Sequence, residues 1–220
     1  MRRTLAGKTV GIHERVVDIG GGVGGNGSAL RSWSRELIGV EPNREAREFA
    51  TKNRGYDFIL EGAAESLEQV MSGRQVDALI AMDVLEHVRD DAAALASFHT
   101  LIRPGGWLVI TVPTFQMLWG LQDDVSEHFR RYRLPRLRSL VRDHGFDVVE
   151  SGYFNFFLFL PILLARRLMR LFPWQTVRSE SEINSSFFDR VFRRIFGAEV
   201  RWFKQGLRYP FGVSAFILAQ

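Results

Sequence analysis

The sequence contains no cysteine, which excludes disulfide bridges, thiolate metal sites and a cysteine nucleophile. It also lacks an apolar run of the roughly 20 residues that a membrane-spanning helix needs. The start of the chain does not have the apolar stretch and small-residue cleavage site of a secretion signal, so we expect a cytoplasmic protein. With 220 residues, 46% of them apolar, the chain can bury the core of one globular domain.

Acidic and basic residues are unevenly distributed. Residues 1–127 contain 13 Lys and Arg against 18 Asp and Glu, a net charge of −5, whereas residues 128–220 contain 16 against 7, a net charge of +9. Most of the 18 phenylalanines also lie in the second part. This composition suits an anionic or amphiphilic partner, or a basic surface over an aromatic core.

Short apolar segments alternate with segments of helical pattern in the first half. We expect strands at 15–19, 37–41, 57–60, 78–82 and 107–112, and helices from residue 28 onward and at 44–53, 64–71 and 90–102. Apolar strands that alternate with helices indicate a parallel sheet covered on both faces.

The pattern changes after the fifth predicted strand. A helix at 134–144 ends at Gly145, a residue that favours the left-handed end of a helix. A sixth strand is predicted at 146–150, mostly helix at 153–204, and a last apolar strand at 211–219. We therefore expect a seven-stranded sheet with a helical insertion before its last strand.

A glycine-rich turn joins the first strand to the first helix. Gly20, Gly22 and Gly25 have the spacing of a dinucleotide-binding fingerprint, and Glu41 lies where a ribose-binding acid is expected. Glycines let the backbone approach a ligand, and the helix start offers free N–H groups. On these residues alone, an NAD(P)-dependent oxidoreductase is one interpretation.

Asp18, at the end of the first strand, favours a different ligand. Its carboxylate would repel a pyrophosphate over the loop and attract a cationic ligand. S-adenosylmethionine (AdoMet) carries an ammonium, a sulfonium and a ribose for Glu41. Two structural interpretations stay open, with Asp18 as an acceptor for loop N–H groups and Glu41 as an acid that complements a helix dipole.

Four segments together resemble the class I AdoMet-dependent methyltransferases, of the bacterial type 11 and 12 kind. In family order and spacing, the motifs are matched by residues 16–24 (VVDIGGGVG), 40–43 (VEPN), 78–88 (ALIAMDVLEHV) and 101–110 (LIRPGGWLVI). The resemblance implies a Rossmann-like fold, with a seven-stranded, mostly parallel sheet and helices on both faces.

The resemblance also implies contacts with the cofactor. The methionine end of AdoMet would lie on the glycine loop, the ribose at Glu41, and the adenine near residues 62–65, where Ala63 replaces an acid that the family often has. The expected cofactor-binding residues are Asp18, Gly20, Gly22, Gly24, Glu41, Pro42, Ala64, Glu65, Met82 and Asp83.

The C-terminal half is similar to a bacterial subgroup often grouped near lipid-linked sugar and polyprenyl chemistry. The similarity rests on Leu118-Trp119, Asp123, residues 128–132 (HFRRY), 145–146, Asn155 and 210–214 (PFGVS). It implies acceptor contacts for Trp119 and Asn155. Arg130 and Arg131 are expected to hold a phosphate or carboxylate of the acceptor, or else to pair with acids on the surface.

Three residues are candidates for removing the acceptor's proton. His128, Tyr132 and His87 follow strands whose C-terminal ends bind ligands in sheets of this type. We prefer His128 because histidine titrates near neutral pH. The structural alternatives are a His128 bonded to Asp123 or Asp124, and a His87 inside a helix.

A metal site is a minor alternative. Asp123, Asp124, Glu127 and His128 offer ligands for a divalent ion. Ion pairs with Arg130 and Arg131 explain these acids more simply, and we expect no metal.

Residues 153–165 (YFNFFLFLPILLA) form the most apolar segment, followed by Arg166, Arg167 and Arg170. Downstream, Phe187, Phe188, Phe192 and Phe196 recur among Arg190, Arg193 and Arg194. Basic amphipathic helices of this kind can contact an anionic membrane, cover an apolar acceptor, or form a core or homodimer interface. Nucleic-acid binding is not expected, because bulky apolar residues interrupt the basic ones.

We therefore expect a single domain over 1–220. Its parts are a cofactor-binding core at 15–113, an acceptor-side loop, helix and strand at 114–152, a helical cap at 153–208 and the last strand at 209–220. The expected function is AdoMet-dependent O- or N-methylation of a small, lipid-linked or amphiphilic acceptor. The alternatives to this function are an NAD(P)-dependent oxidoreductase and a membrane-associated AdoMet-binding protein without catalysis.

Overall fold

The computed structural model describes residues 3–5, 8–10, 13–53, 55–171 and 186–220, and the side chains of 13–52, 55–169 and 194–220. The strands are β1 (Arg3–Leu5), β2 (Lys8–Val10), β3 (His13–Ile19), β4 (Ser34–Val40), β5 (Phe58–Leu60), β6 (Val76–Met82), β7 (Ile102–Pro113), β8 (Val148–Phe154) and β9 (Ser214–Ala219). The α-helices are α1 (Gly27–Arg31), α2 (Arg44–Asn53), α3 (Leu67–Met71), α4 (Asp91–Leu101), α5 (Leu121–Val125), α6 (Leu134–Asp143), α7 (Phe156–Leu171) and α8 (Ser186–Lys204). Three 3-10 helices are η1 (Ala64–Ser66), η2 (Leu85–His87) and η3 (Gln116–Leu118).

Seven strands form one sheet in the order β5-β4-β3-β6-β7-β9-β8. The first five strands in this order are parallel to one another, and β9 runs antiparallel to both β7 and β8. This confirms the seven-stranded, mostly parallel sheet. β1 and β2 form a separate antiparallel pair that the sequence pattern did not predict.

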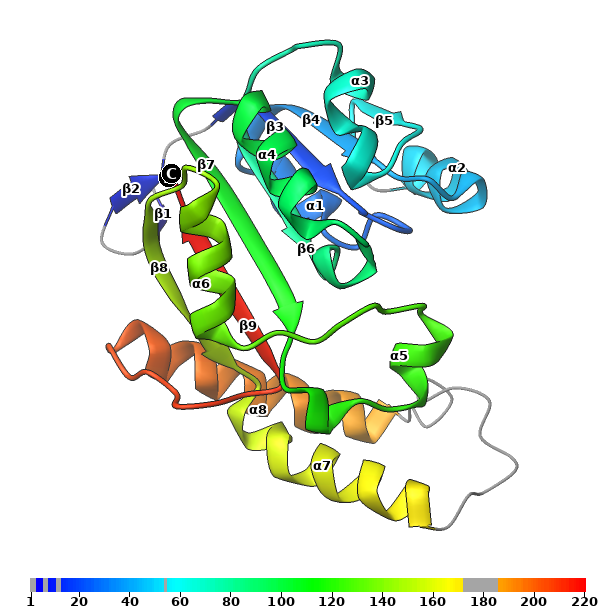
Figure 1. Ribbon diagram of the computed structural model, residues 1–220, viewed down its shortest axis with the longest axis vertical. Helices are drawn as coiled ribbons and strands as arrows, with labels where there is room; N and C mark the ends of the chain where they lie inside the picture. Colours follow the sequence, from blue (N-terminus) through cyan, green and yellow to red (C-terminus); the bar gives the residue numbers. More distant parts are fainter. Residues whose placement is uncertain (1–2, 6–7, 11–12, 54, 172–185) are drawn as a thin grey trace.

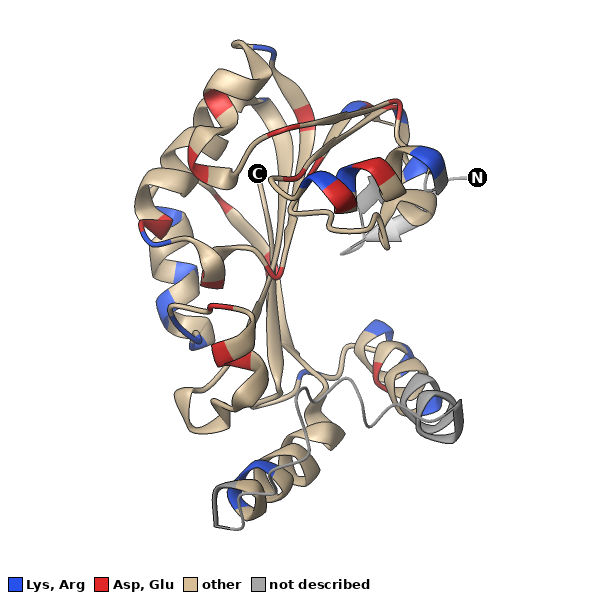
Figure 2. Cartoon of the chain, turned by 90° about the vertical axis from the view of Figure 1, so that its right-hand side faces the viewer, with Lys and Arg blue, Asp and Glu red and all other residues tan. Residues whose placement is uncertain are grey.

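Helices cover both faces of this sheet (Figure 1, Figure 2). On one face, Leu95 and Phe98 of α4 and Leu137 and Val141 of α6 are fully buried in the main core. On the other face, α1 packs along β4 and α2 along β5. The continuous apolar character of the central strands follows from this burial on both sides.

The parallel strands end at a common edge. The sheet register pairs Ile19 with Ala81 and Met82 with Thr111, so β3, β6 and β7 finish side by side. The loops that follow these strands therefore meet at one edge, where open α/β sheets bind ligands.

The sixth of the predicted strands has other bounds in the structure. β8 spans Val148–Phe154 instead of 146–150, because Tyr153 and Phe154 extend its pairing with β9. Asn155 has a φ of 58°, which ends the strand, so α7 begins at Phe156 rather than at residue 153. The last strand likewise begins at Ser214 and not at residue 211.

The helices α7 and α8 lie between β8 and β9 in sequence and below the end of β7 in Figure 1, as a cap inserted before the last strand. Aromatic contacts attach α7, since Phe156 stacks on Tyr209 with ring centroids 5.2 Å apart and Phe159 meets Phe115 at 5.4 Å. None of the helices in the described ranges is long and apolar enough to cross a membrane.

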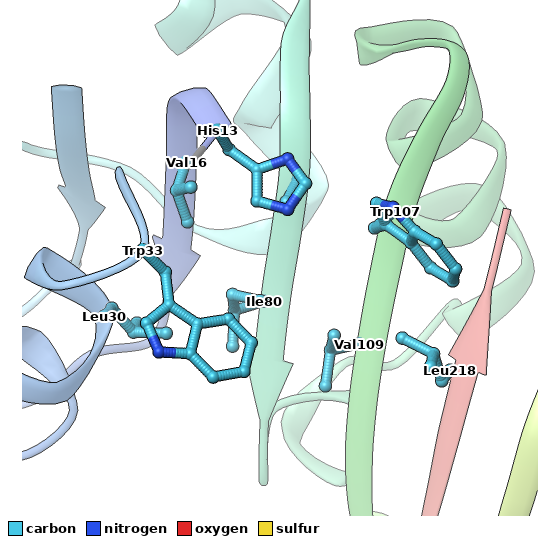
Figure 3. A pocket seen from close by; sticks show the side chains of 9 residues that line it. His13, Val16, Leu30, Trp33, Ile80, Trp107, Val109 and Leu218 are labelled. Carbon is cyan, nitrogen blue, oxygen red and sulfur yellow. The ribbon is translucent and has the colours of Figure 1, made fainter. Parts of the chain in front are cut away.

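An apolar hollow lies on the sheet face opposite α4 and α6 (Figure 3). It is lined by His13, Val16, Leu30, Trp33, Ala78, Ile80, Trp107, Val109 and Leu218. The hollow extends toward the start of β3, so it is separate from the edge where the parallel strands end.

Candidate functional site

The glycine loop after β3 has the backbone geometry that the sequence predicted. Gly20, Gly22 and Gly24 have φ angles of 64°, 51° and 79°, a region that side chains other than glycine rarely adopt. The Gly20 amide donates to the Val40 carbonyl at 2.8 Å, which ties the loop to β4. A Cβ atom on Gly20 would lie 2.8 Å from Cγ2 of Val84, so the position also has no space for a side chain.

Asp18 lies beneath this loop and is fully buried. Its Oδ2 accepts a hydrogen bond of 2.6 Å from the Tyr56 hydroxyl, a partner that sequence analysis did not identify. Burial raises the pKa of Asp18 to about 6, against the opposing hydrogen bonds from Tyr56 and Asn26. The bonds to Asp18 thus come from the side chains of Tyr56 and Asn26, whereas the structural alternative has loop N–H groups as the donors.

Glu41 connects the glycine loop to the second strand. Its Oε2 accepts the Gly22 amide at 2.9 Å and its Oε1 accepts the Asn43 amide at 2.9 Å. Glu41 is buried, and the next residue, Pro42, is exposed. A ligand hydroxyl that binds this carboxylate would therefore replace or share the bond from Gly22.

The remaining predicted cofactor residues lie at the ends of neighbouring strands. Ala64 is buried and Glu65 exposed in η1, after β5. Met82 ends β6, and Asp83 follows with a φ of 53°. The Asp83 amide donates to the Thr111 carbonyl at 3.0 Å, and the Thr111 hydroxyl donates to the Asp83 carboxylate at 3.3 Å. Asp83 therefore lies between β6 and β7 at the common edge.

His128 lies on the loop between α5 and α6 and is held by Asp123. The distance between His128 Nδ1 and Asp123 Oδ1 is 2.9 Å, and the Asp123 side chain is 1% exposed. Burial alone would raise the pKa of Asp123, but hydrogen bonds from Arg131, the Gly120 amide and His128 hold it below its usual value. The geometry thus shows the structural alternative for His128, which is a bond to Asp123. This bond uses Nδ1, so Nε2 does not contact Asp123.

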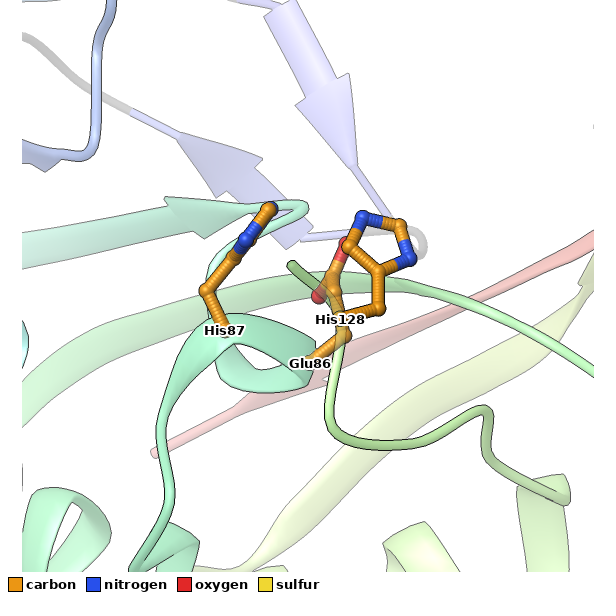
Figure 4. Close-up of side chains that lie close together, drawn as sticks. All are labelled: Glu86, His87 and His128. Atoms are coloured by element: carbon orange, nitrogen blue, oxygen red, sulfur yellow. The ribbon is translucent and has the colours of Figure 1, made fainter. Parts of the chain in front are cut away.

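Glu86, His87 and His128 converge beside this edge (Figure 4), with one ligand atom of each within 4.8 Å of the others. Glu86 is 1% exposed, and neither of its carboxylate oxygens has a hydrogen-bond partner among the described residues. Burial and the nearby Asp83 raise the pKa of Glu86 to about 8. Partial burial and the neighbouring His128 lower the pKa of His87, although a backbone hydrogen bond at Ser126 opposes the shift.

One carboxylate and two imidazoles form a donor set that suits a divalent cation. This cluster shares only His128 with the metal site considered in the sequence analysis. In that site, Asp123 is already bonded to Arg131 and His128. The sequence did not reveal the cluster because His128 is 41 positions after His87.

Tyr132 is buried and bonded inside the chain, which argues against its predicted role as a proton acceptor. It is 2% exposed, and its hydroxyl bonds the Asp91 carboxylate at 2.7 Å and lies 3.2 Å from the Leu85 carbonyl. Burial and the bond to Asp91 raise the pKa of Tyr132. The residue fixes the acceptor-side loop to α4 and η2.

Arg130 and Arg131 form ion pairs within the chain, which is one of the two alternatives that the sequence analysis left open. Arg130 pairs with Asp91 at 2.9 Å and donates to the Arg89 carbonyl. Arg131 donates to both oxygens of Asp123, at 2.7 and 3.0 Å, and to the Thr114 carbonyl.

Trp119 and Asn155 differ in their relation to His128. The Trp119 Nε1 donates to Asp124 at 2.8 Å, and its ring meets the His128 ring edge-on at 6.5 Å. Asn155 ends β8, and its carbonyl accepts from the Val213 amide at 3.4 Å. The structure thus brings Trp119 to His128, whereas Asn155 has a backbone role at the base of the cap.

The cap presents an apolar face to solvent. Leu160, Leu164 and Leu168 of α7 are 59%, 54% and 56% exposed, and Phe196 and Trp202 of α8 are also exposed. Basic residues occur along both cap helices, and Glu199 is the single acidic residue among the cap residues whose side chains the structure describes (Figure 2). The predicted positions Arg170, Phe187, Phe188, Arg190, Phe192 and Arg193 lie outside the described side chains.

Comparison with known proteins assigns this arrangement to a family. The model of a methyltransferase domain family matches residues 3–151. Curated relatives include ubiquinone biosynthesis O-methyltransferases of Burkholderia pseudomallei, 29% identical over 154 residues, and Burkholderia thailandensis, 34% identical over 154 residues. Both alignments cover 62% of this chain and 66% of the relative's length.

Solved structures show the same fold at low sequence identity. A SAM-dependent methyltransferase from Archaeoglobus fulgidus superposes with a TM-score of 0.59 at 17% identity, covering 94% of this chain and 85% of that one. The [4+2]-cyclase SpnF superposes with a TM-score of 0.61 at 17% identity, covering 96% and 76%. Because a cyclase shares the fold, the fold alone does not determine the reaction.

Proposed function

The chain belongs to the methyltransferase domain family, and on that premise we propose that it transfers the methyl group of AdoMet to an oxygen or nitrogen of a small amphiphilic acceptor. The proposal rests mainly on the pair formed by His128 and buried Asp123. This pair lies beside the sheet edge at which β3 ends and the glycine loop begins. The match to a methyltransferase domain family supports AdoMet rather than NAD(P) as the cofactor, and the proposal places AdoMet on the glycine loop.

The residues of the loop edge fit AdoMet. The sulfonium of bound AdoMet supplies an activated methyl group, so the protein has to hold the acceptor in line and remove its proton. The loop from Gly20 to Gly24 would approach the methionine end, Glu41 would accept from the ribose hydroxyls, and Asp83 would face the reacting centre. His128 would take the acceptor's proton.

Two observations support an oxygen acceptor with an apolar part. The curated relatives are named as O-methyltransferases. The cap places α7 beside η3, and Arg166 of α7 bonds Asp123, the partner of His128. An acceptor with an apolar tail and a hydroxyl would place the tail against the cap and the hydroxyl at His128.

Titration of AdoMet followed by methyl transfer tests this function. We expect AdoMet to bind and NAD not to bind, and His128→Asn to lower kcat about 100-fold while the AdoMet affinity stays unchanged. His144→Asn is the matched control, because His144 bonds the Leu140 carbonyl within α6. Transfer that is lost on adding EDTA would instead make Glu86, His87 and His128 metal ligands, and AdoMet binding with no transfer to cell extracts would favour the non-catalytic alternative.

We further propose that the cap contacts the inner face of an anionic membrane. The exposed leucines of α7 and the basic residues around them match the two requirements of such a contact, apolar area and positive charge. Flotation with phosphatidylglycerol vesicles tests it, and Leu160→Ser with Leu164→Ser should abolish binding. Light scattering of the same variants tests the alternative that a second copy of the chain covers this face, because the double variant would then convert a dimer to a monomer.

A further inference from the structure

We infer that Asp123 and Arg166 are positioning residues, of which Asp123 fixes the tautomer of His128 and Arg166 connects Asp123 to the cap helix α7. The inference rests on the proposed role of His128 as the proton acceptor. Neither residue would touch the acceptor, and both would act through the imidazole.

Asp123 receives hydrogen bonds from four residues, three in the segment 120–131 and one in α7. Its Oδ1 faces His128 Nδ1 at 2.9 Å and accepts from Arg131 Nε at 2.7 Å. Its Oδ2 accepts from the Gly120 amide at 2.8 Å, from Arg131 Nη2 at 3.0 Å and from Arg166 Nη1 at 3.4 Å. This set of donors keeps the carboxylate ionised and in one orientation.

An ionised carboxylate can only accept hydrogen bonds. The proton of neutral His128 must therefore be on Nδ1, and Nε2 keeps the lone pair. The ring is also held from the side by His87, whose centroid is 4.5 Å away at an interplanar angle of 88°. Asp123 thus binds Nδ1 of His128 and leaves Nε2 as the nitrogen that can accept a proton.

Arg166 extends this arrangement to the cap. Its side chain is 10% exposed and reaches Asp123 from α7, 43 positions later in the chain. The rest of α7 is attached by aromatic contacts near its start, such as Phe159 with Phe115. A displacement of α7 by an acceptor would therefore move a donor of the carboxylate that orients His128.

The side chain at position 123 allows a sharp test with Asp123→Asn. The new amide group has to place its NH₂ at one of the two oxygen positions. At the Oδ2 position it would meet three donors, whereas at the Oδ1 position it would meet Arg131 Nε and His128. Of these donors, His128 alone can change its tautomer, so the NH₂ should face His128 and move the ring proton to Nε2.

The tautomer of His128 can be read from the ¹⁵N shifts of labelled protein, without any acceptor. We expect Nδ1–H in the wild type, Nε2–H in Asp123→Asn, and Nδ1–H in the control Asp124→Asn. Methyl transfer should fall about 100-fold in Asp123→Asn, with the AdoMet affinity unchanged. An Nε2–H tautomer in the wild type would overturn the inference even if the Asp123 variant did not fold.

Arg166→Met separates the connection to the cap from the tautomer. We expect Nδ1–H to persist, amide exchange in α7 to accelerate, and KM for the acceptor to rise about fivefold with little change in kcat. Arg167→Met, an exposed neighbour on the same helix, should keep the wild-type KM in an assay without membranes. Equal KM values for the two variants would overturn the role of Arg166. A wild type without transfer would refute the proposed function, while the tautomer would still decide the role of Asp123.

Discussion

The two ends of the binding edge are built in different ways. On the cofactor side, the backbone carries the geometry, with three glycines at positive φ and the Gly22 amide bonded to Glu41. On the acceptor side, side chains from distant segments carry it, as in the bonds from Tyr132 to Asp91 and from Arg166 to Asp123. Backbone geometry follows from local sequence, whereas contacts between distant side chains follow from the finished fold.

The largest expected effect comes from a substitution on the cofactor side, where the backbone carries the geometry. Gly20→Val combines a positive φ, which valine avoids, with a clash against Val84. We expect AdoMet affinity to fall about 1000-fold, since strain and overpacking together cost about 4 kcal/mol. Calorimetric titration of AdoMet measures the loss. Gly73→Ala is the control, because Gly73 also has a positive φ of 73° but no neighbour within 4 Å of an added Cβ. If Gly20→Val bound AdoMet as tightly as this control, the loop would not be the binding site.

Much of the fold was predictable from local sequence. The strands β3, β4, β6 and β7 were found from apolar runs followed by turns, and the glycine loop from its spacing. The boundary of β8 was wrong because aromatic residues fit a strand as well as an apolar helix. The left-handed Asn155 that separates the two is a single residue with no periodic signal.

A smaller effect is expected at Glu86 on the acceptor side, where side chains carry the geometry. Glu86 has a pKa of about 8 in the folded protein, raised above its ordinary value by burial and Asp83. A raised carboxyl pKa means that the folded state binds the proton more tightly than the unfolded state. Its contribution to stability is thus complete below the ordinary carboxyl range and is lost as the pH rises through 8.

We expect the free energy of unfolding to fall by roughly 2–3 kcal/mol between pH 5 and pH 8, and Glu86→Gln to remove most of this fall. Urea denaturation at both pH values measures it. Glu68→Gln on the exposed face of α3 is the control and should keep the slope of the wild type. A Glu86→Gln slope equal to that of the control would mean that Glu86 is ionised in the folded protein.

The candidate site was predictable in its motifs but not in its contacts. The motif of residues 78–88 placed Asp83, Glu86 and His87 after β6. Sequence reasoning could not show that His128 lies next to Glu86 and His87, or that the Tyr132 hydroxyl bonds Asp91. His128 and Tyr132 are 41 or more positions away from these partners. Likewise, Tyr56 carried no signal for its bond to Asp18, which spans 38 positions.

The smallest expected effect comes from Tyr56, a side chain distant in sequence that bonds Asp18 on the cofactor side. Tyr56→Phe removes the hydroxyl that donates to Asp18 and that opposes the rise of its pKa. The pKa of Asp18 should then rise further above 6, and AdoMet affinity should fall about fivefold, near 1 kcal/mol for one hydrogen bond. Because the ionised carboxylate favours the cationic cofactor, the loss should be larger at pH 6 than at pH 8. Tyr209→Phe, which removes a hydroxyl bonded to the Glu199 carbonyl in the cap, should leave AdoMet binding unchanged at both pH values. A loss that is equal at the two pH values would show that Tyr56 acts by packing and not through the charge of Asp18.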